Sequence, residues 1–175
     1  MSLILYNLFL GDAADASDMN FLKRNNITDI LIVAKEFKPV YPKTFNYMKI
    51  EAEDSEDFQL IKYFDMMTDF INAAIVRKGC VFVHCAMGIS RSPTAVIAYL
   101  MRYQKMNMKK ARKLVESRRS YIFPNQGFII QLEEYEKNIE KHRHPWKVGD
   151  KQLSKSESLP TEKKESFFSK LFKNF

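Results

Sequence analysis

Short apolar runs rich in β-branched residues characterise the first half of the chain. Residues 27–34 and 80–84 have the composition of buried strands, and residues 46–50 alternate as a more exposed strand would. The N-terminal run, residues 1–10, has no basic residue ahead of it and is interrupted by a polar position, which predicts two short strands instead of a signal peptide. The pattern therefore predicts several short strands before residue 90.

Helical periodicity appears between these strands and takes over after residue 91. Residues 57–77 place apolar side chains at three- and four-residue steps, the period of a helix with one buried face. Further helical segments follow at residues 92–105, 108–119 and 127–142. This order predicts an α/β fold, with a central mixed, twisted sheet flanked by helices and a helix-rich C-terminal half.

The length and composition suit one compact domain followed by a tail. Of the 175 residues, 46% are hydrophobic, enough for a substantial core. We expect the folded domain to span residues 1–145, and residues 146–175, rich in Lys, Ser and Glu, to form a basic, flexible tail. No run approaches the roughly 20 consecutive apolar residues that span a bilayer.

The end of the tail, residues 164–175, carries an apolar pattern of its own. On a helix, one face would hold Phe167, Phe168, Leu171, Phe172 and Phe175. Such a face, with lysines among the polar positions, could make weak contact with an anionic membrane surface. Because the helix is too short to form alone, a disordered end or a flap on the domain is the alternative.

The charge and the cysteines narrow the partners and the compartment. A net charge of +7 favours anionic partners such as phosphoproteins, membrane surfaces or nucleic acid, without choosing between them. Cys80 and Cys85 fall five positions apart in an expected strand, so their Cα atoms should lie about 16 Å apart, too far for a disulfide. With no disulfide framework, we expect a cytoplasmic protein with access to the nucleus.

Residues 81–93 carry the most informative pattern in the chain. A buried strand leads into a tight loop with one glycine and then into a helix with proline near its start. Such a loop points successive backbone N–H groups at an anion and adds the positive end of the helix dipole. The residues expected to cradle a phosphate are Ala86, Met87, Gly88, Ile89, Ser90 and Arg91.

Cys85 and Arg91 have the spacing of a nucleophile and its phosphate clamp. The guanidinium of Arg91, six positions after Cys85, can bind two phosphate oxygens at once. Cys85 then lies beneath the phosphorus. Because helix N-termini and neighbouring cations favour thiolates, we expect Cys85 to be mostly ionised and ready to attack.

Two other interpretations of this segment fit the residues less well. Cys85 could be a small buried hydrophobe and Arg91 a surface charge, but that does not explain why both fall in one turn. A zinc site of Cys80, His84 and Cys85 is disfavoured, because strand alternation places Cys85 on the opposite face and no fourth ligand is near. We expect no metal and no other cofactor.

A carboxylic acid is the usual donor of the proton that a leaving phenolate or alkoxide needs. The candidates cluster in one stretch, at Glu51, Glu53, Asp54, Glu56 and Asp57. Spacing alone does not choose among them. Some of them are expected to solvate the loop and to stabilise the first turn of the helix that starts near residue 57.

Residues 84–92, His-Cys-Ala-Met-Gly-Ile-Ser-Arg-Ser, resemble the signature of the protein tyrosine phosphatase superfamily. The Gly-x-Ser-Arg-Ser ending is similar to the dual-specificity branch, as is Pro-Asn-Gln-Gly-Phe at residues 124–128. The resemblance covers about residues 3–142. With the domain starting within a few residues of Met1, we expect no N-terminal docking domain, and the chain resembles the small atypical enzymes of this branch.

The resemblance implies a cysteine-phosphatase fold and a role in signalling, by dephosphorylation of phosphotyrosine and phosphoserine or phosphothreonine through a phosphocysteine intermediate. It assigns the nucleophile to Cys85, the general acid and base to Asp54, and stabilisation of the leaving thiolate to Ser92, for which a helix cap is the alternative. It also implies that His84 orders the loop and tunes the thiol, and that Asn125 supports the loop, for which a helix-starting turn is an alternative that is compatible with this role.

The same resemblance leaves two questions of binding open. Arg118 or Arg119 could meet a second negative group on the substrate, with plain solvation as the alternative. The loop interior carries no charge, unlike the lysine-bearing loops of related phosphoinositide phosphatases, which favours phosphoprotein substrates over lipids and over RNA or other nucleic acid. We expect a monomer.

A phosphate-binding module without turnover, a pseudophosphatase, is the competing interpretation. That role usually follows the loss of a catalytic residue. Cys85, Asp54, Arg91 and Ser92 are all present here, which favours an enzyme.

Overall fold

The structure of the protein, a computed structural model, describes residues 1–143. The expected domain boundary at residue 145 and the tail 146–175, with its apolar end at 164–175, lie outside the described residues. They therefore stay predictions.

A mixed sheet forms the centre of the fold. Its strands are β1 (Ser2–Leu5), β2 (Leu8–Gly11), β3 (Asp29–Val33), β4 (Asn46–Ile50) and β5 (Val81–His84). They lie in the order β1-β2-β5-β3-β4. Only β1 runs antiparallel to its neighbour, and the pairs β2–β5, β5–β3 and β3–β4 are parallel. The prediction of an α/β fold with a central mixed sheet is confirmed.

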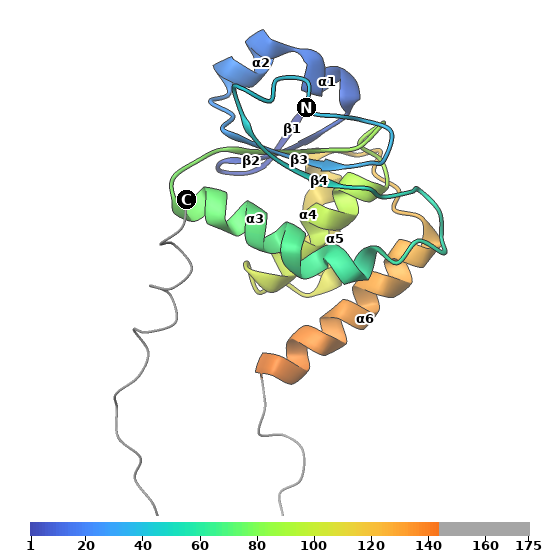
Figure 1. Ribbon diagram of the computed structural model, residues 1–175. Helices are drawn as coiled ribbons and strands as arrows, with labels where there is room; N and C mark the ends of the chain where they lie inside the picture. Colours follow the sequence, from blue (N-terminus) through green and yellow to red (C-terminus); the bar gives the residue numbers. More distant parts are fainter. Residues whose placement is uncertain (144–175) are drawn as a thin grey trace, which may run out of the picture. The chain divides into compact units, whose positions relative to one another are not determined.

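Helices cover both faces of this sheet. They are α1 (Ala13–Ser17), α2 (Met19–Arg24), the 3-10 helix η1 (Leu60–Tyr63), α3 (Phe64–Val76), α4 (Arg91–Arg102), α5 (Met108–Arg118) and α6 (Gln126–Arg143). In Figure 1, α1 and α2 lie on one side of the strands and α3 to α6 on the other. The helix-rich C-terminal half is thereby confirmed. Within residues 1–143, no helix is long and apolar enough to cross a bilayer.

Alternate side chains of β3 and β5 belong to two apolar clusters, one on each face of the sheet. Leu31 and Val83 point into the larger cluster, with side chains of α3 to α6, whereas Ile30 and Phe82 pack in the smaller one, with side chains of α1 and α2. Both strands are therefore buried on both faces, which explains why they read as continuous apolar runs.

The helix expected over residues 57–77 starts later than predicted. The regular α-helix begins only at Phe64, after the 3-10 turn of η1. Gln131 of α6 accepts a hydrogen bond from the Ile61 N–H (2.9 Å) and donates one to the Phe58 carbonyl (2.9 Å). These side-chain bonds occupy backbone groups that a continuous helix would have paired, so residues 54–58 form bends and turns instead of the first turn of the helix.

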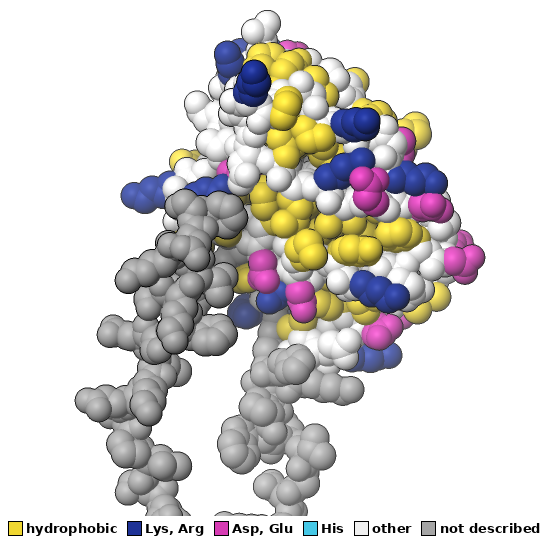
Figure 2. All heavy atoms as spheres, viewed as in Figure 1, with side chains coloured by type: hydrophobic (Ala, Val, Ile, Leu, Met, Phe, Trp, Pro, Cys, Tyr) yellow, Lys and Arg dark blue, Asp and Glu magenta, His cyan; other side chains and the backbone are white. Residues whose placement is uncertain are grey.

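Four polar residues follow the ends of the parallel strands and therefore lie at the same edge of the sheet, at the carboxyl ends of the strands. Asp12 follows β2, Glu36 follows β3, Asp54 follows β4 and Cys85 follows β5. In sheets of this type, ligands bind outside the carboxyl ends of the strands. On the face drawn in Figure 2, basic and acidic side chains are interspersed and do not form a patch of one sign. The edge of the sheet formed by the carboxyl ends of the strands is therefore the expected position of a ligand site.

Candidate active site

The phosphate loop, residues 85–91, turns the chain from β5 into α4. At its centre, Gly88 has a φ of +66°. A Cβ atom there would lie 2.5 Å from the Gly11 carbonyl oxygen and 2.5 Å from Arg119 Nη2. Both the backbone conformation and the close packing therefore require glycine at this position.

Cys85 is buried directly after β5, beside the first turn of α4. The Ser92 hydroxyl donates a hydrogen bond to Cys85 Sγ across 3.1 Å. Ser92 lies inside the helix, while the residue at the N-cap position is Ser90, so the helix-cap alternative for Ser92 is wrong. The chain thus pairs its loop thiol with a buried hydroxyl.

The predicted orientation of Cys85 relative to Cys80 is wrong. Alternation was expected to place Cys85 on the face opposite Cys80, but both thiols belong to the smaller apolar cluster. The strand ends at His84, so its alternation does not extend to Cys85. Both cysteines are free thiols. Within residues 1–143, no group of three His, Cys, Asp or Glu side chains is placed to hold a metal ion.

Arg91 is a buried cation with one unpaired donor. It is 5% exposed, and its Nη atoms bind the carboxylate of Glu36 at 2.7 and 2.9 Å and the Ala52 carbonyl at 3.1 Å. Nε has no hydrogen-bond partner among the described residues. Burial alone would lower the pKa of Arg91, but its hydrogen bonds with Glu36 and the nearby negative charges raise it. A charged, partly unsatisfied guanidinium therefore lies beside Cys85, as an anion site needs.

Asp54 is the acidic residue of the 51–57 segment that the fold brings to the phosphate loop. Its Oδ1 accepts hydrogen bonds from Ser90 Oγ (2.6 Å) and Asn125 Nδ2 (3.0 Å), and its Oδ2 lies 3.5 Å from Arg91 Nε. Two of the other candidates form ion pairs away from the loop, Glu51 with Lys49 and Glu53 with Lys35. The remaining two, Glu56 and Asp57, are exposed. Geometry therefore separates Asp54 from its neighbours where spacing could not.

Asn125 connects the phosphate loop, the 51–57 segment and α6. Its backbone N–H donates to Ser90 Oγ (3.2 Å), and its side-chain oxygen accepts from the Phe128 N–H (2.9 Å), which caps α6. Two residues later, a Cβ atom on Gly127 would lie 2.0 Å from the Glu56 carbonyl oxygen. The glycine thus lets the start of α6 approach the backbone of the segment that carries Asp54.

His84 is buried beneath the loop. Its Nδ1 lies 3.2 Å from the Cys85 carbonyl oxygen, and its ring stacks on Phe82 with 5.4 Å between the ring centroids. Desolvation lowers the pKa of His84, although the contact with the Cys85 carbonyl opposes this effect. The imidazole is therefore neutral at neutral pH and supports the loop backbone.

The sequence did not identify one residue of the site, Glu36, and it suggested the wrong role for another, Arg119. Glu36 holds Arg91, and the only signal for it was its position just after a strand that neighbours β5 in the sheet. Arg119 was expected to meet a substrate or to be solvated, but it is 3% exposed. It donates to the carbonyls of Gly88 (3.0 Å) and Met87 (3.2 Å) and lies 3.4 Å from Asp12. Both expectations were wrong for Arg119, which fastens the phosphate loop from behind, whereas Arg118 is exposed and its role stays a prediction.

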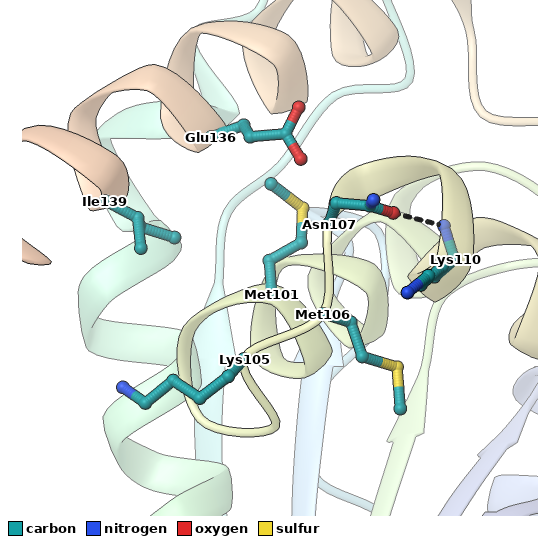
Figure 3. Close-up of a pocket in the computed structure, with 7 residues that line it drawn as sticks. All are labelled: Met101, Lys105, Met106, Asn107, Lys110, Glu136 and Ile139. Atoms are coloured by element: carbon teal, nitrogen blue, oxygen red, sulfur yellow. Dashed lines mark hydrogen bonds between the residues drawn. The ribbon is translucent and has the colours of Figure 1, made fainter.

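A pocket of about 270 Å³ lies elsewhere, between the end of α4, the start of α5 and α6 (Figure 3). Two of its polar side chains are already used in the fold, since Asn107 caps α5 through the Lys110 N–H and Glu136 accepts from the Met108 N–H. It contains neither a cysteine nor an unpaired arginine donor. We therefore assign the chemistry of this molecule to the phosphate loop and not to this pocket.

Comparison with known proteins agrees with this geometry. The family "Dual specificity phosphatase, catalytic domain" matches residues 8–138. Dual specificity protein phosphatase 1B of Arabidopsis thaliana is 47% identical over 140 residues, which cover 80% of this chain and 84% of that protein. Dual specificity protein phosphatase 1 of the same plant is 45% identical over 139 residues, covering 79% of this chain and 70% of that protein.

Solved structures show the same fold. Human tyrosine phosphatase-like serine/threonine/tyrosine-interacting protein superposes with a TM-score of 0.75 at 37% identity, covering 79% of this chain and 96% of that one. Human DUSP28 superposes with a TM-score of 0.79 at 27% identity, covering 81% of this chain and 99% of that one. The chain therefore belongs to the family of dual specificity phosphatase catalytic domains, in the protein tyrosine phosphatase superfamily.

Proposed function

We propose that the protein is a dual-specificity protein phosphatase that hydrolyses phosphotyrosine and phosphoserine or phosphothreonine through a phosphocysteine intermediate. The observation that carries this proposal is the buried guanidinium of Arg91 beside a buried thiol: its Nε–H makes no hydrogen bond, although Asp54 Oδ2 lies 3.5 Å away. An unsatisfied charged donor in a loop of backbone N–H groups is suited to a phosphate dianion.

In the first step, the Cys85 thiolate attacks phosphorus. The S–P bond forms and the P–O bond to the substrate side chain breaks, while Arg91 binds the transferring oxygens. Asp54 donates its proton to the leaving oxygen. Because Oδ1 of Asp54 already accepts two hydrogen bonds, from Ser90 and Asn125, we assign the proton to Oδ2.

In the second step, water hydrolyses the phosphocysteine. Asp54, now a carboxylate, takes a proton from the attacking water as the water oxygen forms a bond to phosphorus, and the S–P bond breaks to release phosphate. The leaving group is the Cys85 thiolate. The Ser92 hydroxyl, which donates to Cys85 Sγ across 3.1 Å, stabilises the negative charge that develops on sulfur.

A binding module without turnover remains the second candidate. The fold alone does not separate the two, because one superposing structure is described as phosphatase-like and interacting. The side chains favour the enzyme: a phosphate-binding module would use Arg91 but has no need for Asp54, which Ser90 and Asn125 hold beside the loop.

The proposal extends to the setting in which the enzyme acts. We place it in the cytoplasm with access to the nucleus, as a monomer acting in signalling on phosphoproteins, and its free thiols are consistent with a reducing compartment. Contact of residues 164–175 with an anionic membrane is tested by removing residues 160–175 and measuring binding to vesicles that contain phosphatidylserine. Unchanged binding would exclude the membrane contact.

Hydrolysis of para-nitrophenyl phosphate in the presence of EDTA tests the activity and its residues. We expect Cys85→Ser to abolish turnover and Asp54→Asn to lower kcat by about 100-fold. Glu56→Gln, which changes an exposed carboxylate of the same segment, is the matched control and should stay close to wild type. A folded but inactive wild-type protein that still binds phosphate would favour the binding module.

A further inference from the structure

Three large apolar side chains are exposed around the phosphate loop. The exposed fractions are 66% for Met87, 55% for Tyr121 and 72% for Phe123. A single exposed apolar residue needs no explanation. These three, however, belong to two segments that are fastened to each other beside Cys85, and we call them the apolar rim.

Hydrogen bonds hold the apolar rim to the phosphate loop. The Phe123 N–H donates to the Ile89 carbonyl across 2.7 Å. Arg119 donates to the Met87 carbonyl across 3.2 Å, and its guanidinium lies 4.4 Å from the ring centre of Tyr121. Because Arg119 is itself buried, these contacts fix the backbone of both segments. The rim is therefore a positioned surface and not a loose loop end.

The apolar rim also lies along the path that a substrate must take. A bound phosphate occupies the loop at residues 85–91, so the peptide around the phosphorylated residue runs over the neighbouring surface. Phe123 stands two positions before Asn125, whose side chain binds Asp54, so its segment borders the site directly. Extended residues advance about 3.3 Å each, which brings side chains within about two positions of the phosphorylated residue over this surface.

The charges near the site indicate which side chain fits. The three rim side chains carry no charge and the 51–57 segment is acidic, while the exposed basic residue nearest to the rim in sequence is Arg118, three positions before Tyr121. An acidic neighbour in the substrate would be repelled by that segment and would gain nothing from the rim, whereas an apolar neighbour would lose exposed surface on both partners.

Resting on the proposed function, we propose that the apolar rim selects phosphopeptides with an aromatic or branched aliphatic side chain within two residues of the phosphorylated residue. Phe123, the most exposed of the three, makes the main contact. The rim thereby adds a preference for certain substrate sequences to the proposed phosphatase activity. This preference does not depend on the residues that carry out the chemical step.

Paired phosphopeptides test this preference. Each pair differs only by Phe or Gly at one position between −2 and +2, and we expect wild-type kcat/KM to favour Phe by about tenfold at one or more positions. Phe123→Ala should reduce this ratio to within about twofold and leave hydrolysis of the Gly peptides and of para-nitrophenyl phosphate unchanged. The control is Tyr6→Ala, because Tyr6 is an aromatic residue that is 87% exposed in the turn between β1 and β2. This variant should keep the wild-type ratio of kcat/KM between the Phe and Gly peptides.

A second variant reverses the chemistry of the rim. Phe123→Lys should lose the preference for Phe and gain one for Asp at the same peptide position. Equal rates for Phe and Gly peptides in the wild type would overturn the proposal. So would an equal loss on both peptides in Phe123→Ala, because that result would place Phe123 against the phosphorylated residue itself.

Failure of the proposed function gives a different result. An inactive wild type would remove the catalytic proposal, and the same peptide pairs would then be compared by fluorescence-anisotropy binding. Tighter binding of the Phe peptides, lost in Phe123→Ala, would uphold the rim without catalysis. Equal binding would reject it.

Discussion

The two ends of strand β5 each carry a buried cysteine, in opposite chemical environments. Cys80 precedes the strand, and burial, together with the negative charge of Asp29, raises the pKa of Cys80 to about 11. Cys85 follows the strand and lies against the Ser92 hydroxyl and within the field of Arg91. The same residue type is thus kept protonated at one end of a four-residue strand and placed beside a cation at the other.

The buried charges at these two ends differ in the same way. Asp29 accepts hydrogen bonds from Thr28 (2.6 Å), Asn46 (2.7 Å) and Arg77, which close its network completely. The Nε–H of Arg91 makes no hydrogen bond, and its nearest acidic group, Asp54 Oδ2, lies 3.5 Å away. A buried charge whose hydrogen bonds are all made holds strands together, whereas one with a free donor can bind a ligand. The number of hydrogen bonds left unmade, and not burial alone, therefore distinguishes the site from the rest of the fold.

Alkylation should show the largest contrast between the two ends. At pH 7, a thiol with a pKa of about 11 is ionised to about 1 part in 10⁴, so we expect iodoacetate to leave Cys80 unmodified under conditions that modify Cys85. Peptide mass spectrometry measures both rates. Tungstate should protect Cys85, and both cysteines should react in urea. Comparable rates in the folded protein would remove the contrast.

Replacing each arginine by lysine sharpens the comparison. Arg91→Lys loses the planar fork that binds Glu36 and phosphate together, so kcat/KM for para-nitrophenyl phosphate should fall by about 10²- to 10³-fold. Arg77→Lys, at the other end of the strand, should keep kcat/KM and lower the denaturant midpoint instead. A large loss of activity in Arg77→Lys would show that the closed network also serves the site.

Gly127→Ala tests whether the site depends on the close approach of α6. The new Cβ would lie 2.0 Å from the Glu56 carbonyl, so the segment that carries Asp54 must move. Because small displacements of catalytic groups are costly, we expect kcat to fall by about 10- to 100-fold, with little change in inhibition by phosphate. Gln126→Ala, at an exposed neighbouring position, is the control. A parallel loss of phosphate affinity would place the effect on the loop instead.

The sequence predicted the part of the site that is contiguous in the chain. The strand, the glycine turn and the helix around Cys85 and Arg91 follow from local pattern, because each residue acts on near neighbours. Choosing Asp54 required the family resemblance, since five carboxylates shared its segment. The fold class was predictable for the same reason as the loop: buried strands and amphipathic helices are local signals.

The missed residues act over long sequence distances. Glu36 binds Arg91 from 55 positions away and Arg119 binds the Gly88 carbonyl from 31 positions away. A basic residue at a helix end is usually solvated, and only the packing of α5 behind the loop buries Arg119. The late start of α3 has the same origin, because Gln131 reaches Ile61 across 70 positions.

His84 provides the smallest effect, a change in stability with pH. Desolvation lowers the pKa of His84 in the folded protein, while the unfolded chain takes up a proton near the ordinary histidine pKa of about 6.5. The unfolded state therefore binds more protons just below pH 6.5, so stability is complete above that pH and falls as the pH decreases towards the lowered pKa of the folded state. Between pH 7.5 and 5.5, urea unfolding should show the wild type losing more stability than His84→Gln. Equal losses in the two proteins would mean that His84 is protonated as easily in the folded chain as in the unfolded one, and that this end of β5 tolerates a buried imidazolium.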